Sequence, residues 1–120
     1  MHELAIAEAL VAIAEEHAGR RRVERVEVRV GALRQVVPGA LAFAFELVAQ
    51  GTVVEGAELA LEQVPARGAC RACGARAVLE RFPFACPACD GMDVEIVDGM
   101  QLSVEALEVT AEEPVYEEAT

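Results

Sequence analysis

The sequence predicts an α+β fold that is interrupted by a small four-cysteine module. Segments with helical periodicity alternate with segments of strand periodicity over residues 4–64. All four cysteines then fall between residues 70 and 89, in a stretch with few large aliphatic side chains. Strand character returns at residues 94–97 and 102–109, so the cysteine stretch looks like an insertion.

The first predicted element is an amphipathic helix over residues 4–18. Gly19 follows at the position where helices commonly end. His17 lies in the last turn, where a histidine can bind free carbonyl groups, and we interpret it as structural. Apolar side chains recur along the helix at three- and four-residue intervals, with Ile6 and Ile13 widening a stripe of Leu4, Ala7, Leu10, Val11, Ala14 and Ala18.

A βαβ unit is predicted next. Residues 23–30 alternate valine with charged residues, which is the pattern of a half-buried strand. Pro38 suits the first position of a second helix that ends near Gly51, and a second strand follows at residues 58–64. The two strands should be parallel and joined by a right-handed crossover, with residues 102–109 rejoining the same sheet. The buried face of the second helix should carry Leu41, Ala44, Phe45 and Val48.

Composition excludes several classes of function. The 120 residues carry a net charge of −11, and all ten basic residues are arginine. This charge repels nucleic acid, whereas a metal cation or a basic protein surface would suit it. No apolar run approaches the ~20 residues that a membrane helix needs, and the first residues do not resemble a signal peptide, so we expect a cytoplasmic protein. The acidic residues 111–120 predict a disordered tail.

The cysteines form two Cys-x2-Cys pairs. Each pair can wrap one metal ion in a tight turn, here called a knuckle, and Gly74 and Asp90-Gly91 supply suitable turn residues. Four thiolates in a tetrahedral cage suit zinc best among the common metals. Because four ligands leave no open coordination position, we expect this zinc to be structural. Its ligands would be Cys70, Cys73, Cys86 and Cys89.

Three other assignments of the cysteines stay open. Two disulfides would require an oxidising compartment. A redox-active pair would be expected in a βαβ context at the start of a helix, and neither pair begins a predicted helix. An iron site of the rubredoxin kind also uses Cys-x2-Cys-Gly and Cys-Pro-x-Cys turns, although we expect a longer spacer there than the twelve residues between these pairs.

The N-terminus offers a second and weaker metal site. The Met1 amine, the His2 backbone amide and the His2 ring Nδ1 can chelate one ion through a five-membered and a six-membered ring. Deprotonation of an amide requires a metal that prefers square-planar nitrogen, namely Ni(II) or Cu(II). A fourth donor could be the Glu3 amide, its carboxylate or a side chain of a partner. The simpler interpretation is an exposed histidine before a helix, with Glu3 complementing the helix dipole.

Several sequence motifs occur together over about residues 1–109, and their combination is the most specific feature of the chain. They are the two knuckles and four further stretches: Met1–Glu8, Val26–Leu33, Pro38–Glu46, and Gly51-Thr52 with Glu55-Gly56-Ala57. With this combination the sequence resembles the HypA/HybF family, the nickel-insertion accessory proteins of hydrogenase maturation. The resemblance implies two helices on a small three-stranded mixed sheet, with a zinc-ribbon-like module inserted before the last strand.

The resemblance also implies that His2, with Met1 and Glu3, binds nickel. Nickel would be delivered to the large subunit of a nickel–iron hydrogenase with the help of a HypB-type GTPase. We expect a metallochaperone and not an enzyme. The main alternative is a zinc-ribbon protein-interaction module without a nickel role, and the sequence leaves a homodimer open. The expected domains are residues 1–65 with 92–110 for nickel and residues 66–91 for zinc.

Overall fold

The computed structural model describes residues 2–80 and 84–110, so Met1 and the predicted tail at residues 111–120 lie outside the described part. The chain divides into two compact units. Of the described residues, the first unit contains 2–28, 36–61 and 104–110. The second unit contains 29–35, 62–80 and 84–103. No helix in the described ranges is long and apolar enough to cross a membrane. The elements are α1 (His2–Ala18), β1 (Val23–Gly31), a 3-10 turn η1 (Ala32–Arg34), α2 (Pro38–Ala49), β2 (Glu58–Val64), β3 (Arg67–Cys70), β4 (Arg76–Val78), β5 (Val94–Asp98) and β6 (Leu102–Val109).

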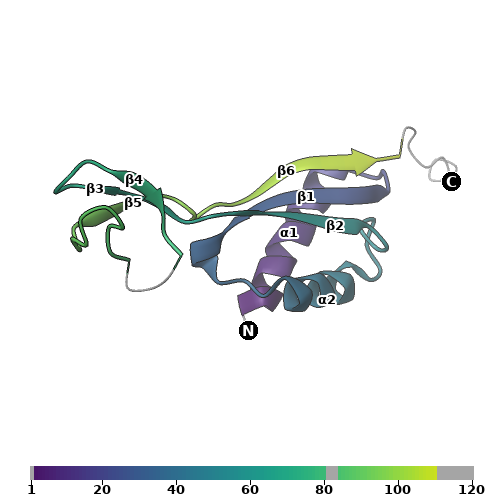
Figure 1. Cartoon of the computed structure of the whole chain (residues 1–120). Helices are drawn as coiled ribbons and strands as arrows, with labels where there is room; N and C mark the ends of the chain where they lie inside the picture. Colours follow the sequence, from purple (N-terminus) through teal and green to yellow (C-terminus); the bar gives the residue numbers. More distant parts are fainter. Residues whose placement is uncertain (1, 81–83, 111–120) are drawn as a thin grey trace, which may run out of the picture. The chain divides into compact units, whose positions relative to one another are not determined.

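The first sheet has the strand order β2-β1-β6, and both helices lie on one side of it (Figure 1). β1 and β2 are parallel, because Arg25 of β1 pairs with Glu58 of β2 and, four residues later on both strands, Arg29 pairs with Glu62. β1 and β6 are antiparallel, because a backbone hydrogen bond joins Arg22 to Thr110 at one end and another joins Gly31 to Gln101 at the other end. The expected fold of two helices on a small mixed sheet is therefore confirmed.

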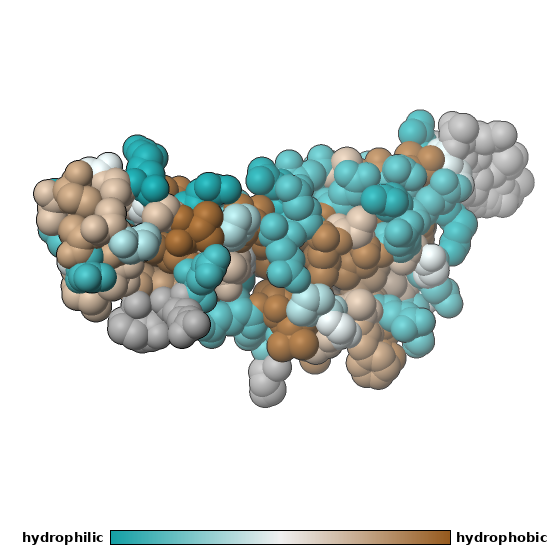
Figure 2. Space-filling view, in the orientation of Figure 1, coloured by the Kyte–Doolittle hydropathy of each residue, from teal (hydrophilic) through white to brown (hydrophobic). Residues whose placement is uncertain are grey.

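Only one face of this sheet contributes to the core. Hydrophilic side chains cover most of the region over β1, β2 and β6 in Figure 2. The opposite face packs its valines against the apolar stripes of the two helices. The buried apolar residues of these elements are Ala7, Leu10, Val11, Ala14, Ala18, Val23, Val26, Val28, Val30, Leu41, Ala44, Phe45, Ala49 and Val64.

The start of α1 differs from the prediction. The helix begins at His2, and Leu4, expected in the buried stripe, is 49% exposed. The stripe extends back from Ala7 by four residues to Glu3, which is only 8% exposed. The periodicity of apolar residues predicts Leu4 in the buried stripe, but the helix buries Glu3 and leaves Leu4 exposed. Ile13 is also more exposed than expected, at 37%.

The second sheet has the order β4-β3-β5, and all its strand pairs are antiparallel. The strand predicted at residues 94–97 exists as β5, but it pairs with β3, where Cys70 lies opposite Val94. β5 therefore completes the sheet of the cysteine module and does not pair with β6, which follows it in the chain. β6 rejoins β1 as predicted. Whether the expected domains fold independently stays a prediction.

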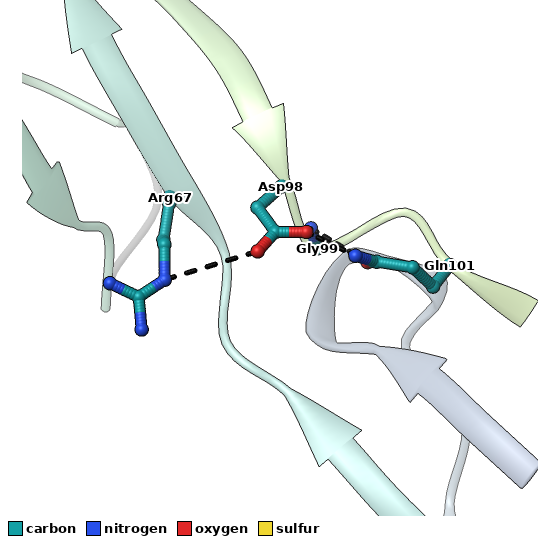
Figure 3. Close-up of polar contacts among 4 residues, drawn as sticks. All are labelled: Arg67, Asp98, Gly99 and Gln101. Carbon is teal, nitrogen blue, oxygen red and sulfur yellow. Dashed lines mark hydrogen bonds and ion pairs between the residues drawn. The ribbon is translucent and has the colours of Figure 1, made fainter.

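The chain crosses from β5 to β6 through a small polar network (Figure 3). The Gly99 N–H donates to Gln101 Oε1 over 2.9 Å, and the Gln101 amide donates to the Asp98 carboxylate. Arg67 Nε lies 3.9 Å from the same carboxylate. The end of β1 packs so closely against this crossing that a Cβ on Gly31 would lie 2.0 Å from the Gly99 carbonyl oxygen. Glycine is therefore required at position 31 by space.

Gly31→Ala should destabilise the protein by about 1–3 kcal/mol, because backbone atoms must move to make room for the methyl group. The measurement is the free energy of unfolding in urea. Gly39→Ala is the matched control, since a Cβ there meets no atom within 4 Å. We expect the control to be neutral or slightly stabilising, and equal unfolding midpoints for the two variants would contradict the close approach.

Candidate metal centres

The second unit brings all four predicted cysteines together. Cys70 ends β3 and Cys73 lies in the turn from β3 to β4, whereas the other pair precedes β5. The four sulfur atoms all lie within 4.8 Å of one another, and the nearest pairs are Cys70–Cys89 at 3.7 Å and Cys73–Cys86 at 3.6 Å. A tetrahedron with Zn–S bonds of about 2.3 Å has sulfur–sulfur edges of roughly 3.8 Å. The cysteines therefore fit a tetrahedral tetrathiolate metal site.

The two knuckles have the same local construction. In each, the first cysteine is buried and accepts a backbone N–H on its sulfur, from Cys73 to Cys70 over 3.5 Å and from Ala88 to Cys86 over 3.3 Å. The second cysteine of each pair, Cys73 or Cys89, is exposed. A backbone N–H of each knuckle therefore stabilises the sulfur of its first cysteine.

Cys70 and Cys89 differ in proton affinity. The N–H of Cys73 stabilises the Cys70 thiolate and lowers the pKa of Cys70 to about 7. At Cys89 the N–H of Gly91 favours the thiolate, but the neighbouring sulfurs, Cys70 first, outweigh it and raise the pKa of Cys89 to about 12. Four thiolates at this spacing repel one another, so full ionisation requires a bound cation.

The geometry also bears on the other assignments of the cysteines. All four are free thiols, and the shortest sulfur–sulfur distance of 3.6 Å is far longer than a disulfide bond of about 2.05 Å. Within the described ranges neither pair begins a helix, which is the setting expected for a redox-active pair. Metal binding is thus the chemistry that the arrangement suits.

The N-terminal candidates lie in the first turn of α1, in the first unit. His2 is 52% exposed at its side chain, and its Nε2 lies 3.8 Å from Glu3 Oε2. The amides of a first helical turn have no acceptor within the helix, so the backbone nitrogens at this end are not used by α1 itself. Met1 lies outside the described residues. The structure therefore places His2 and Glu3 side by side at an accessible helix end.

Glu3 has a clear structural task. Its Oε2 accepts the N–H of Val37 over 3.0 Å, and this bond is the main cause that lowers the pKa of Glu3 to about 2. Val37 is the N-cap residue of α2, and its own side chain makes no capping bond. Sequence reasoning did not identify this contact, because it joins residues 34 positions apart and no local pattern marks it.

His17 lies at the other end of α1 and serves the helix. Its Nδ1 is 2.9 Å from the carbonyl oxygen of Ile13, one turn earlier, and its side chain is exposed. The interpretation of His17 as a residue that interacts with the carbonyl end of the helix is confirmed. It therefore provides a matched control for any metal role of His2.

Cys73→Ala should remove the metal and unfold the cysteine module while the helical unit survives. Metal binding supplies on the order of 10 kcal/mol to sites of this kind, whereas α1 and α2 have their own core. We expect metal analysis to show loss of the ion and circular dichroism to retain the helical signal. Ala72→Ser, an exposed non-ligand in the same turn, should keep both. Loss of the helical signal in Cys73→Ala would contradict the prediction.

Glu3→Gln should make the helical unit less sensitive to acid. The pKa of Glu3 is about 2 in the folded protein against 4.5 for an ordinary glutamate, so its ionised form stabilises the fold above about pH 4.5. This contribution is lost as the pH falls towards 2. Glutamine can still accept the Val37 bond but carries no charge. We therefore expect the free energy of unfolding, followed by the helical signal in urea, to fall further between about pH 6 and pH 3 in the wild type.

The control for this comparison is Glu8→Gln, an exposed carboxylate on the same helix. It should follow the wild type closely, including any effect of metal loss in acid. An equal acid response of all three forms would show that the Glu3 carboxylate contributes nothing specific to stability.

Comparisons with known proteins agree with this architecture. The model of the HypA family, described as a hydrogenase/urease nickel incorporation metallochaperone, matches residues 1–109. The hydrogenase maturation factor HypA of Geobacter metallireducens is 42% identical over 109 residues, which are 91% of this chain and 99% of that protein. The corresponding factor of Trichodesmium erythraeum is 39% identical over 110 residues, which are 91% of this chain and 96% of that protein.

Solved structures give the same answer. The solution structure of the nickel metallochaperone HypA from Helicobacter pylori matches with a TM-score of 0.65 and 26% identity, and it covers 93% of this chain and 100% of its own. A second HypA solution structure matches with a TM-score of 0.67 at the same identity, with 93% and 98% covered. The matched family, the mixed sheet with two helices and the four converging cysteines lead to one conclusion: the chain belongs to the HypA family of hydrogenase maturation factors and nickel metallochaperones.

Proposed function

We propose that this chain carries Ni(II) at its N-terminus and delivers it to the large subunit of a nickel–iron hydrogenase. The single observation that supports this most is the position of His2, which is accessible and lies in the first turn of a well-anchored helix. Nickel is the cargo of this reaction. A site at the end of the chain suits transfer, because incoming ligands can replace its donors one at a time.

The proposed donors are the Met1 amine, the His2 amide and the His2 Nδ1. Together they offer the nitrogen-rich, planar arrangement that Ni(II) prefers. Because the Glu3 carboxylate already binds the N–H of Val37, we propose the Glu3 backbone amide as the fourth donor. Binding requires a neutral ring and deprotonated amides, so nickel affinity should fall as the pH falls.

Zinc is the metal that we propose for the four cysteines. The tetrathiolate donor set and the sulfur spacing favour it, and a saturated tetrahedral site has no position at which to activate water. Zinc would hold the cysteine module together, and the protein would not be an enzyme. A purified protein without the colour of an iron–thiolate centre would support zinc over iron.

The proposed partners are a HypB-type GTPase and the hydrogenase large subunit, in the cytoplasm. A cargo site must release its metal, so an affinity near micromolar, or about −8 kcal/mol, would suit the role. The family description names urease as well as hydrogenase, but the relatives at 42% and 39% identity are both named hydrogenase maturation factors. Hydrogenase is therefore the recipient that we propose.

The test is a nickel titration of the zinc-loaded chain, read by calorimetry with separate metal analysis for zinc. We expect His2→Ala and a form with extra residues before Met1 to lose binding by tenfold or more, about 1.4 kcal/mol. His2→Ala removes the ring nitrogen, and residues added before Met1 convert its terminal amine into a peptide amide. His17→Ala, at the far end of the same helix, should bind like the wild type.

The competing function is a zinc-ribbon interaction module without a nickel role. One observation favours it: the cysteine site is complete without any residue of the N-terminus. Equal nickel binding by the wild type, the His2→Ala variant and the extended form would establish this alternative and refute the nickel site.

A further inference from the structure

Arg71, the residue after Cys70, joins the first knuckle to the segment that leaves the second knuckle. Its backbone N–H donates to the Asp93 carbonyl oxygen over 2.9 Å. Its guanidinium Nη1 donates to Asp93 Oδ1 over 2.8 Å, and Nη2 lies 3.9 Å from Glu95 Oε1. We call this group of Arg71, Asp93 and Glu95 the Arg71 clamp.

The clamp is a continuation of the β3–β5 ladder. In that ladder Ala69 lies opposite Glu95, and Cys70 lies opposite Val94. One further step places Arg71 opposite Asp93 and diagonal to Glu95, which are the two positions from which cross-strand side chains interact. The antiparallel pairing therefore extends past the last residue of β3 and into the first knuckle.

This extension matters because the four sulfurs come from two separate turns. Each knuckle closes on itself, through a bond from the Gly74 N–H to the Cys70 carbonyl at one and from the Asp90 N–H to the Cys86 carbonyl at the other. These bonds fix the two sulfurs within a turn but not the distance between turns. Asp93 lies a few residues after Cys89, at the start of the segment that leads into β5, so its bonds to Arg71 connect the two knuckles.

We propose that Arg71 is a positioning residue for the metal site, which holds the two knuckles together through Asp93 and Glu95 and so slows the release of the metal. Arg71 touches no metal in this role and acts only through the placement of the thiolates. The inference rests on the proposed zinc site and is independent of the proposed nickel site. Sequence reasoning missed it, because Arg71 and Asp93 are 22 positions apart and no local pattern joins them.

The expected effect is moderate. The side chains of Arg71 and Asp93 are 57% and 61% exposed, and exposed ion pairs are individually weak. Residues that orient metal ligands have larger effects, about tenfold or more on metal binding. Between these limits, we expect loss of the clamp to speed zinc release by about three- to tenfold.

The experiment measures zinc release from the full-length, zinc-loaded chain into an excess of a chromophoric chelator at low salt. Arg71→Ala should release zinc about three- to tenfold faster than the wild type, and Asp93→Asn should change the rate in the same direction. The matched control is Arg76→Ala, an exposed arginine three residues after Cys73. It should not change the rate.

Two further measurements separate a charge clamp from general support of the structure. The charge-swapped double variant, Arg71→Asp with Asp93→Arg, should restore the rate to within about twofold, since the cross-strand pair is rebuilt. Raising the salt to about 1 M should narrow the difference between wild type and Arg71→Ala. Acceleration that neither the swap nor salt reduces would overturn the clamp and indicate lost packing.

Equal release from the wild type and Arg71→Ala would overturn this inference alone. A wild-type chain that holds no zinc in metal analysis would overturn the zinc assignment and the clamp together. The two failures are therefore distinguishable in the same set of samples.

Discussion

The hydrogen bond between the Val37 N–H and the Glu3 carboxylate fixes how the helical unit begins. A carboxylate in a core position is unfavourable unless its charge is satisfied, and here a backbone N–H provides a partner. The same contact places a negative charge at the N-terminus of α2, where the helix dipole favours it. The start of one helix is thus held against the start of the other. His2 remains at the surface beside this anchored residue.

The anchoring changes the meaning of the N-terminal motif. A Met-His-Glu start has the form of three successive ligands, yet one of these residues uses its side chain to join two helices. Glu3 would then support the proposed nickel site indirectly. Because Glu3 is fixed, the neighbouring His2 has less conformational freedom to lose when it binds a metal. In the proposed nickel site, the exposed His2 ring could exchange the metal while the neighbouring Glu3 stays fixed by its bond to Val37.

Much of the fold follows from local pattern, and the exceptions are non-local. α1, α2, β1, β2 and β6 were predictable because their periodicity is regular, and the cysteine site because paired spacing is specific. β3 and β4 are only four and three residues long, which is too short for a strand periodicity to be recognised in the sequence. The pairing of β5 with β3 depends on residues more than twenty positions apart. The periodicity also predicted that Leu4 is buried, whereas Glu3 is buried in its place. A pattern of apolar residues cannot reveal the distant N–H of Val37 that Glu3 accepts.

The two knuckles share one asymmetry that has a practical consequence. Each offers one sheltered sulfur, at Cys70 or Cys86, and one sulfur at the surface, at Cys73 or Cys89. A competing chelator therefore meets the second cysteine of each pair first, although the sheltered Cys70 has the lowered pKa. Access and proton affinity thus favour different cysteines, so the order in which the four become alkylated would show whether opening of the centre or ionisation of its thiols limits the reaction.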